Sequence, residues 1–517
     1  MKDYLVIESY TYFLVKPNKS STKDAERELE TFLGHFKTYE RTYVKRFDKH
    51  TKKWFGQMVT KLSKVFYIND GTYIRLPIGC IREFKKYLEM KFFSYEEIVS
   101  KNANIESIDF TLTDTSKKPR PYQNKCINHI YNNGEGMYLI EFRTGMGKTF
   151  TSISTLSKFK YKFGVLVLPK YIDKWVSDIT SQTDIKENEI YIFSGGDSIN
   201  NIVKNPEILK KIKCFIFSMR TTSNYINEFE TPETRAETKY LISPDELFNK
   251  LGIGVLLNDE THQEFHAMYR ILLRTQAPIF IGMSATLDSN NPRIRNLYKV
   301  TFPPSTRINE IVETPDKKYI HVKSTTYKVS HPKNIKCESV QGYHQVTYEQ
   351  FIMKRPKFLA GYRDMILYYV DKDFIKRRNE NEKLLIFVGS VDLAKYLSFV
   401  IKREYPDLDV RSYVEDDEYD NVISADICVS TVLSSGTAVD IPGLINVIQT
   451  ISLGSLPMNQ QALGRLRQIK GREVVYRYLY CSGIRKHRDL NKQRIDAIGH
   501  LWNKFTLETY KKSLFSK

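Results

Sequence analysis

The chain has 517 residues, of which 41% are hydrophobic and 27% are charged. This composition indicates a globular protein of about three domains with ample core, and it excludes an intrinsically disordered chain. The formal net charge of +19 indicates a polyanionic partner, and the 13% of aromatic residues would let bases stack beside phosphate contacts.

The six cysteines lie far apart and form no CxxC pair, so the sequence predicts neither a zinc ribbon nor a disulfide scaffold. A reducing, intracellular setting fits this pattern. No run approaches the roughly 18 apolar residues of a membrane span, and the first residues, MKDYLVIESY, carry no secretory pattern. No basic amphipathic helix stands out either, so we expect a soluble protein that binds nucleic acid rather than a membrane.

Residues 1–112 form the first predicted domain, a small α+β module. The stretch YLVIESYTYFLV is typical of a strand, and apolar residues at helical spacing over residues 25–36 predict a helix after it. The segments VFYIND and GTYIRL flank Asp70-Gly71, a strong turn dipeptide, and predict a β-hairpin. Pro77 then opens a second predicted helix, which has apolar residues at helical spacing from residue 78 to residue 88.

Basic and aromatic residues are interleaved between residues 37 and 64, inside this module. Lysine and arginine suit phosphate and aromatic rings suit bases, so the segment is predicted to bind nucleic acid. A solvated surface over a small core is the other interpretation. The candidate contact residues are Lys45, Arg46, Lys52, Lys53 and Trp54.

A phosphate-binding loop is predicted at the sequence RTGMGKT. Strand-like MYLIEF precedes it and helix-compatible FTSISTLSKF follows it, which is the context that such a loop needs. The glycines would let backbone N–H groups close on phosphate oxygens, Lys148 would reach the β- and γ-phosphates, and the Thr149 hydroxyl would hold Mg²⁺. Phe142 occupies the first glycine position of the full GxxxxGK[ST] pattern. The predicted nucleotide-binding residues of the loop are Thr144, Gly145, Met146, Gly147, Lys148 and Thr149.

Two adjacent carboxylates, Asp259 and Glu260, follow an apolar run in the sequence GVLLNDETHQ. The run is typical of a buried parallel strand, and ligands bind at the carboxyl ends of strands in open α/β sheets. Beside a phosphate loop, Asp259 would hold Mg²⁺ through water and Glu260 would polarise the attacking water. Taken alone, the acids also fit a solvated turn.

Further motifs follow one another between about residues 120 and 480. RPYQ comes first, then RTGMGKT, VLVLPKYIDKW, DETH, MSAT, LLIFVGSVDLAKYL, STVLSSGTAVD and QALGR. In this order they resemble the glutamine motif and motifs I, Ia, II, III, IV, V and VI of DExH-type helicases of superfamily two. The layout of TVLSSGTAVDIPGL followed by QQALGRLRQ is similar to that of the phage UvsW-type branch-migration helicases and the poxvirus transcript-release helicases.

The resemblance implies a role for each motif residue. Structural alternatives stay open, since serine and threonine at a strand end also cap helices, motif V also fits structural turns and arginines also cover surfaces. The implied roles are adenine recognition by Tyr122 and Gln123; ribose contact by Gly436 and Asp440; contact with ATP by Gln461, Arg465 and Arg467; coupling by His262, Ser284 and Thr286; and nucleic-acid phosphate contact by Thr431 and Ser434. With Lys148, Asp259 and Glu260, the three motif VI residues complete the predicted catalytic set.

The resemblance also implies an α/β fold with two RecA-like lobes, whose parallel β-sheets are flanked by helices. Recurrent apolar strands agree with it: LIEF, VLVL, FIFS, VLLN and IFIG precede Pro303, and LLIFV, ICVS and NVIQ follow it. The predicted domains are the module at 1–112, lobe 1 at 113–303 and lobe 2 at 304–517. Lobe 2 is predicted to end in a helical tail with Leu490, Ile498, Trp502 and Phe505.

The predicted function is ATP- and Mg²⁺-dependent translocation along DNA, which would remodel branched DNA in phage or viral replication, recombination and repair. The resemblance implies 3′-to-5′ polarity. Single-stranded and branched DNA are the expected partners, and we expect a cytoplasmic monomer, in the host cell if the protein is viral. RNA as the substrate, as in transcript release, and replication or recombination proteins as partners stay open. A non-enzymatic nucleic-acid-binding protein with ATP as a switch is the remote alternative.

The sequence GRLRQ departs from the family pattern, which has a second arginine four residues after the glycine. This chain has Gln468 there, and Arg467 comes one residue early. On a helix one residue is about 100° of rotation, so Arg465 and Arg467 would diverge, and Arg465 is predicted to be the principal arginine finger. A non-helical backbone would re-aim Arg467.

Overall fold

A computed structural model describes most of the chain. The chain divides into two compact units. Unit 1 comprises residues 1–142 and 147–315, and unit 2 comprises residues 143–146 and 316–517. The structure describes residues 2–18, 23–48, 52–113, 118–143, 145–285, 287, 289, 291–313, 318–335, 337–339, 342–414, 417–418, 420–431, 441–452, 456–469, 471–499 and 501–515.

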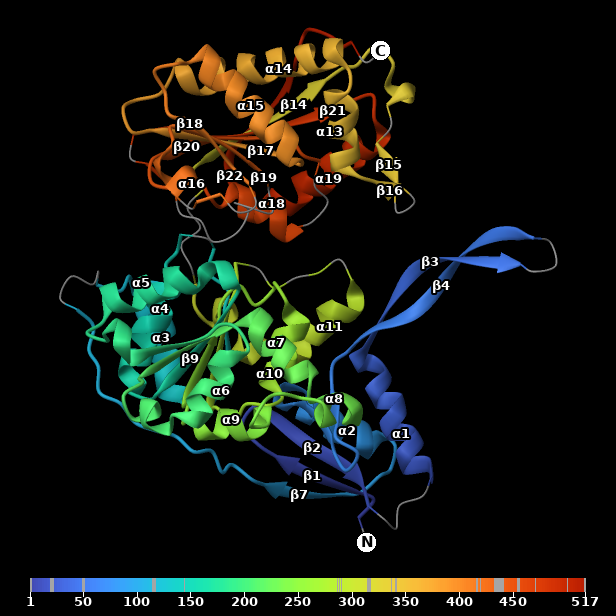
Figure 1. Ribbon diagram of the computed structural model, residues 1–517, viewed down its shortest axis with the longest axis vertical. Helices are drawn as coiled ribbons and strands as arrows, with labels where there is room; N and C mark the ends of the chain where they lie inside the picture. Colours follow the sequence, from blue (N-terminus) through green and yellow to red (C-terminus); the bar gives the residue numbers. More distant parts are fainter. Residues whose placement is uncertain are drawn as a thin grey trace. The chain divides into compact units, whose positions relative to one another are not determined.

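Unit 1 begins with a small mixed sheet and two helices (Figure 1). The strand order is β5 (Ile68–Asn69), β6 (Ile74–Pro77), β2 (Tyr12–Pro17), β1 (Tyr4–Glu8) and β7 (Tyr95–Val99), and only the β1–β7 pair of this order is parallel. The apolar sides of α1 (Lys23–Leu33) and α2 (Ile81–Met90) are buried, as their spacing predicts. The stretch predicted as one strand, YLVIESYTYFLV, is instead the antiparallel pair β1 and β2.

The segment between α1 and β5 forms a long β-hairpin, which the sequence did not reveal. Strand β3 (Lys37–Asp48) pairs antiparallel with β4 (Lys53–Val65), and the two form a sheet of their own. At about 3.4 Å per residue, strands of 12 and 13 residues extend about 40 Å. The ribbon projects away from the other elements of unit 1 (Figure 1).

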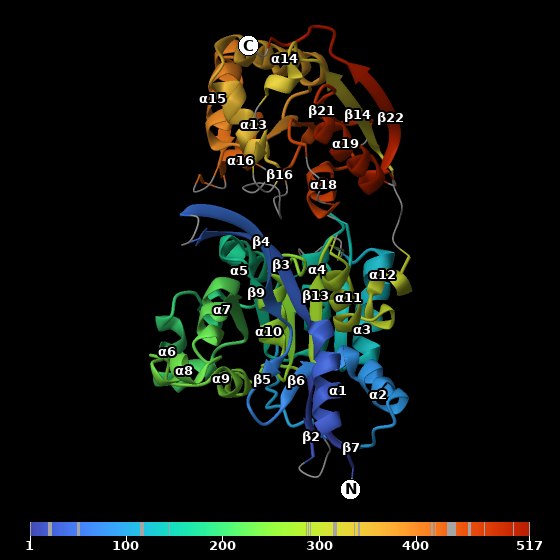
Figure 2. The ribbon, with the colours of Figure 1, turned by 90° about the vertical axis from the view of Figure 1, so that its right-hand side faces the viewer.

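The rest of unit 1 is built on a parallel sheet whose strands are buried on both faces, which explains their nearly continuous apolar sequences. Helices α3 and α4 lie on one face, and α7 and α10 lie on the other (Figures 1 and 2). The strand order is β10 (Ile190–Phe193), β11 (Cys214–Ser218), β9 (Phe163–Val167), β12 (Val255–Asn258), β13 (Ile279–Met283) and β8 (Gly136–Ile140). The helices are α3 (Pro121–Asn133), α4 (Lys148–Phe159), α5 (Ile172–Gln182), α6 (Asp197–Lys204), α7 (Met219–Asn227), α8 (Pro232–Ala236), α9 (Pro244–Lys250), α10 (Phe265–Leu272), α11 (Pro292–Thr301) and α12 (Ile308–Ile311).

The small N-terminal sheet and the parallel sheet share one hydrophobic core. Polar contacts also join them, because the Thr11 hydroxyl donates to the Thr275 carbonyl at 2.6 Å and Arg75 pairs with Asp245 at 2.6 Å. The N-terminal module is therefore packed firmly on lobe 1. The residue boundaries predicted for the domains stay a prediction.

Unit 2 is a second parallel sheet with helices on both faces. Alternate residues of β17 explain the arrangement: Leu384 and Ile386 pack with the helices α13 to α15, whereas Leu385 and Phe387 pack with residues of α18 and α19. The strand order is β18 (Val410–Tyr413), β19 (Ile427–Thr431), β17 (Lys383–Val388), β20 (Leu444–Gln449), β21 (Val474–Cys481), β14 (Ile320–Tyr327) and β22 (Trp502–Thr509). The other elements are a small pair, β15 (Glu338–Ser339) and β16 (Gly342–Tyr343), and the helices α13 (Gln345–Met353), α14 (Pro356–Val370), α15 (Val391–Glu404), α16 (Asp420–Ser424), α18 (Leu456–Leu463) and α19 (Arg485–Ile498).

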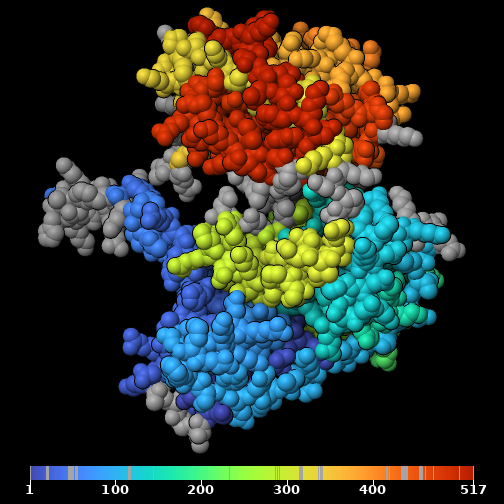
Figure 3. Space-filling model, turned by 180° about the vertical axis from the view of Figure 1, so that it is seen from behind, coloured from blue at the N-terminus to red at the C-terminus, as the bar shows by residue number. Residues whose placement is uncertain are grey.

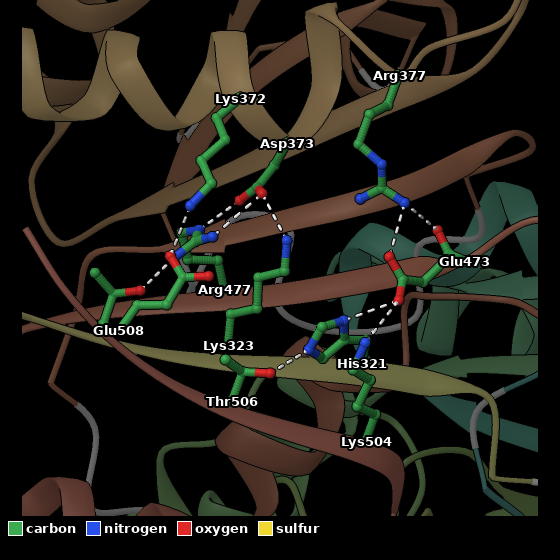
Figure 4. A network of polar contacts seen from close by, with 11 residues as sticks. His321, Lys323, Lys372, Asp373, Arg377, Glu473, Arg477, Lys504, Thr506 and Glu508 are labelled. Carbon is green, nitrogen blue, oxygen red and sulfur yellow. Dashed lines mark hydrogen bonds and ion pairs between the residues drawn. The ribbon is translucent and has the colours of Figure 1, made fainter.

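The predicted helical tail is half wrong. Leu490 and Ile498 lie on α19, but Trp502 and Phe505 lie on the edge strand β22, which pairs parallel with β14. A network of polar contacts fixes this strand to the sheet (Figure 4). The fully buried Arg477 donates to Glu508 of β22 at 3.1 Å and also pairs with Asp373.

The same network holds β22 at a second point. The Thr506 hydroxyl and a ring nitrogen of His321 lie 2.7 Å apart, and the other ring nitrogen of His321 lies 2.9 Å from Glu473 (Figure 4). Buried charges need such partners to offset the loss of hydration. Glu508 and Thr506 of the last strand supply part of these partners.

The predicted α/β fold with two RecA-like parallel sheets and an N-terminal α+β module is confirmed. In the part of the chain that the structure describes, no helix is both long and apolar enough to cross a membrane. All six cysteines are buried and none is in a disulfide.

Candidate active site

The predicted phosphate loop connects β8 to α4, as its flanking sequences indicate. Gly145 and Gly147 both have φ of +81°, in the left-handed region that favours glycine. A Cβ atom on Gly147 would also lie 2.5 Å from Nε2 of Gln123, so a larger residue there would require the Gln123 side chain to move. Helix α4 follows directly, and the N–H groups of its first turn are of the kind that can bind an anion.

The phosphate loop lysine and the second predicted carboxylate come together. Lys148 is the first residue of α4, and its Nζ lies 4.0 Å from Oε1 of Glu260, which follows β12. Lys148 also donates to the Phe142 carbonyl at 3.3 Å. Two residues far apart in the chain therefore lie in one cluster, as the prediction of a shared site requires.

Asp259 is held by two hydrogen bonds. The indole N–H of Trp175 donates to Oδ2 at 2.9 Å, and the backbone N–H of Glu260 donates to Oδ1 at 3.0 Å. Burial raises the pKa of this carboxyl, and the neighbouring charge of Glu260 adds to the rise. A cation beside Asp259 would offset both effects, so this carboxylate suits the predicted Mg²⁺ ligand, and the role of Thr149 stays a prediction.

Glu260 is held in an uncommon backbone conformation, with φ of +49° at a buried non-glycine residue. Its Oε2 lies 3.4 Å from Nδ1 of His262, and the same nitrogen lies 3.0 Å from the Ser284 hydroxyl, after β13. Burial lowers the pKa of His262, which keeps the ring neutral. The three side chains thus link the ends of two neighbouring strands, and the coupling role stays a prediction.

Tyr122 and Gln123, predicted to contact adenine, lie at the start of α3 and are buried. Oε1 of Gln123 accepts the backbone N–H of Arg120 at 2.8 Å and so caps its own helix. The Tyr122 ring packs edge-on against Phe142, with ring centres 5.3 Å apart. Both side chains therefore adjoin the phosphate loop, and adenine contact stays a prediction.

The motif VI arginines lie beyond the end of α18, which stops at Leu463. Of the two geometries left open for them, the non-helical one applies, because residues 464–469 are not helical. Arg465 is buried in unit 2, whereas Arg467 is half-buried and donates to the Gly464 carbonyl. The directions of the Arg465 and Arg467 side chains therefore cannot be derived from the rotation of about 100° per residue of an α-helix.

The remaining predicted residues are placed only in part. Thr431 ends β19 and is buried, and Lys52 is exposed beside the start of β4. The backbones of Lys45, Arg46, Lys53 and Trp54 lie in the hairpin and that of Gln461 in α18, but their side chains lie outside the described part. Five predicted residues lie entirely outside the described residues: Thr144, Thr286, Ser434, Gly436 and Asp440.

Trp175 is the functional residue that sequence reasoning missed. It belongs to the segment quoted as motif Ia, but nothing in the sequence shows that its fully buried indole reaches Asp259. A tryptophan N–H needs a partner when buried, so an acid at the end of an adjacent strand was the signal to look for.

Replacing Trp175 by phenylalanine is expected to lower the free energy of unfolding by about 1–3 kcal/mol, because a buried carboxylate loses a hydrogen-bond donor. Urea denaturation of the variant and the wild type measures this difference. Trp502→Phe is the matched control, since that ring stacks on Phe505 at the sheet edge. Equal losses in the two variants would show that the bond to Asp259 contributes nothing.

Comparison with known proteins identifies the segment that carries this site. Residues 116–289 match the family described as type III restriction enzyme, res subunit. This range contains the phosphate loop, the two carboxylates and Ser284.

Two curated proteins are similar to a longer part of the chain. The general transcription and DNA repair factor IIH helicase/translocase subunit XPB2 of Arabidopsis thaliana is 23% identical over 395 residues, which are 73% of this chain and 47% of that protein. The DNA 3'-5' helicase XPB of Kineococcus radiotolerans is 22% identical over 185 residues, which are 36% of this chain and 29% of that protein. The chain thus spans less than half the length of these relatives. Among solved structures, T4 UvsW aligns over 100% of both chains with 14% identity and a TM-score of 0.35.

Proposed function

We propose that this chain, which carries a helicase domain of superfamily two, hydrolyses ATP and uses the energy to move along DNA. One observation carries the proposal: Lys148 at the start of α4 and Glu260 after β12 meet at 4.0 Å, next to Asp259. A phosphate-binding helix start and a pair of buried acids are the two halves of a nucleotide hydrolase.

Each residue of the cluster has a chemical task. The N–H groups of the first turn of α4 and the Lys148 ammonium hold the phosphates, and Asp259 and Thr149 hold the metal ion. Mg²⁺, when bound, neutralises charge on the phosphate oxygens. Glu260 accepts a proton from the attacking water, and the neutral His262 passes the state of this site on to Ser284.

DNA engagement is proposed for the hairpin β3–β4. Tyr39 pairs with Leu62 and Tyr43 pairs with Met58 across the two strands, and all four side chains are exposed. Because residues alternate between the faces of a strand, the exposed Arg41 lies on the same face, between the tyrosines. An exposed apolar face that contains a cation fits bases and phosphates together.

Gly56 supports the proposal that the exposed face of the hairpin binds DNA. A Cβ atom at Gly56 would lie 1.5 Å from the hydroxyl oxygen of Tyr43, so the glycine leaves room for the tyrosine ring to lie along the strand. Aromatic rings commonly cover glycines in this way and keep a strand extended. The ring is thereby held flat on an exposed face, as a stacking platform for a base requires.

Replacing residues 38–64 by a two-residue turn is expected to weaken binding to a DNA fork and to leave basal ATP hydrolysis intact. Lys37 and Val65 pair across the hairpin, so a short turn can join them. The slope of log K against log salt should become shallower by about 0.9 for each lost phosphate contact on duplex DNA. Fluorescence anisotropy at several salt concentrations measures the slope, with Glu40→Gln on the same hairpin as the control. An unchanged slope would mean that the hairpin binds something else.

The finer features of the proposal come from the resemblance to branch-migration helicases. They are 3′-to-5′ movement, remodelling of branched DNA and a place in phage or viral replication, recombination and repair. The expected setting is the cytoplasm, of the host cell if the protein is viral, where replication or recombination proteins are candidate partners of the monomer.

ATP hydrolysis in the presence of single-stranded DNA, a fork, a four-way junction and single-stranded RNA tests the choice of substrate. We expect the fork and the junction to stimulate hydrolysis most strongly. Stimulation by RNA alone would favour the transcript-release alternative. ATP binding with no hydrolysis, in the presence or absence of each nucleic acid, would favour the non-enzymatic ATP-switched binding protein.

A further inference from the structure

The base of the hairpin is attached to the two helices that follow the candidate catalytic motifs. Helix α10 begins at Phe265, just after the DETH sequence, and α11 begins at Pro292, just after the Ser284 motif. Each helix contacts a different strand of the hairpin, at its base. In Figure 3 the yellow-green atoms of α11 lie against the blue base of the hairpin.

The contact from α11 is made by Arg293. Its Nη1 donates to the carbonyl of Lys37, the first residue of β3, at 3.1 Å. The same guanidinium lies 5.0 Å from the centre of the Tyr39 ring, within the range of a cation–π contact. Arg293 thus binds strand β3 at two points, the backbone carbonyl of Lys37 and the side-chain ring of Tyr39.

The contact from α10 is made by His266. Its Nε2 lies 2.8 Å from the carbonyl of Val65, the last residue of β4. Burial lowers the pKa of His266 to about 4, so the ring is neutral near pH 7. Since a carbonyl only accepts, Nε2 carries the proton and donates it. Phe66, the next residue, packs on the rings of Phe265 and Tyr269 of the same helix.

These two contacts meet at one point of the hairpin, because Lys37 and Val65 are cross-strand partners. Behind them, the two motifs are themselves joined. The backbone N–H of Thr261 donates to the Met283 carbonyl at 2.8 Å, and His262 lies 3.0 Å from Ser284. Hydrogen bonds therefore join the two motifs, and the helices that follow these motifs in the chain, α10 and α11, both contact the hairpin base.

We propose that Arg293 and His266 are positioning residues that transmit the nucleotide state of the ATP site to the β3–β4 hairpin. A small shift of the strand ends at β12 and β13 would reach the hairpin through α10 and α11. Because the strands extend about 40 Å from this base, a small rotation there displaces the distal end much further. This inference rests on the proposed function.

The test compares Arg293→Ala and His266→Ala with the wild-type chain. Both variants are expected to keep ATP hydrolysis stimulated by single-stranded DNA. They are expected to separate the strands of a fork with at least about fivefold less product per ATP consumed, the lower end of usual coupling energies. Arg293→Lys, which keeps the cation and a donor, should recover part of the yield. Lys299→Ala, an exposed residue of the same helix, is the matched control.

A distance measurement separates coupling from a merely structural role. All native cysteines are buried, so dyes can be placed on Lys61→Cys in β4 and Lys210→Cys on the exposed surface of unit 1. The distance is expected to change when a non-hydrolysable ATP analogue binds, and the change should be lost in Arg293→Ala and His266→Ala.

Two outcomes would overturn the inference: wild-type yield per ATP in both variants, or an unaltered distance change in them. If the wild-type chain itself neither hydrolyses ATP nor separates a fork, the proposed function fails instead. The two failures are therefore distinguishable.

Discussion

Glu260→Gln is expected to slow ATP turnover by about 10²–10⁴-fold, the usual contribution of a general base, and to leave ATP binding intact. The amide cannot accept a proton from water, yet it preserves the size of a buried side chain that lies 4.0 Å from Lys148. Single-turnover hydrolysis and equilibrium binding of a fluorescent ATP analogue measure the two effects separately.

Lys148→Ala is the matched variant, since it should weaken nucleotide binding by removing the cation that faces the phosphates. The pair thus separates binding from chemistry within one cluster. Near-normal turnover in Glu260→Gln would remove that glutamate from catalysis.

The largest expected effect in unit 2 belongs to Arg465. In the role predicted from the sequence it stabilises charge on the transferred phosphoryl group, and Arg465→Ala should reduce turnover by about 10³-fold or more. Arg467→Ala should cost less, because the Arg467 guanidinium already donates to the Gly464 carbonyl of its own turn. Steady-state hydrolysis at saturating DNA measures both.

Arg465→Lys is the control for charge alone, because lysine keeps the cation and loses the planar fork. It should recover only part of the activity. A larger loss from Arg467→Ala than from Arg465→Ala would contradict the assignment.

The sequence was most informative where local pattern and chemistry coincide. The glycines at positive φ and the lysine at the start of α4 identify the phosphate loop, and the apolar run before Asp259 is the buried strand β12. In both places a single stretch of chain determines the geometry. The meeting of these two stretches could be predicted as well, because the carboxyl ends of parallel strands lie at the same edge of a sheet.

The hairpin β3–β4 was not predicted because it lacks the usual signal of a strand. Strands are recognised by the alternation of buried apolar and exposed polar residues, but one face of this hairpin exposes Tyr39, Tyr43, Met58 and Leu62. None of the described side chains of the hairpin belongs to the hydrophobic core, so a pattern of buried apolar residues has no reason to develop there.

The C-terminal strand was mistaken for a helix for a different reason. Trp502 and Phe505 are three residues apart, a helical spacing, and their rings stack with centres 4.9 Å apart. In the structure, a register shift between Ile320 and His321 lets β22 pair with β14 across an irregularity. A bulge changes which residues share a face, so the period of two is broken there.

The bond between Trp175 and Asp259 joins residues 84 positions apart, and no local pattern encodes it. The same holds for Arg293 and His266, whose partners are backbone carbonyls of the hairpin. Any residue supplies a carbonyl, so such contacts leave no trace in the partner's sequence.

Displacement of a triplex-forming oligonucleotide from duplex DNA tests the central claim most directly, because it reports movement along DNA rather than hydrolysis alone. With ATP and Mg²⁺, the wild-type chain is expected to displace the oligonucleotide, whereas Glu260→Gln and the wild type with ADP are not. ATP hydrolysis stimulated by DNA without any displacement would contradict the account.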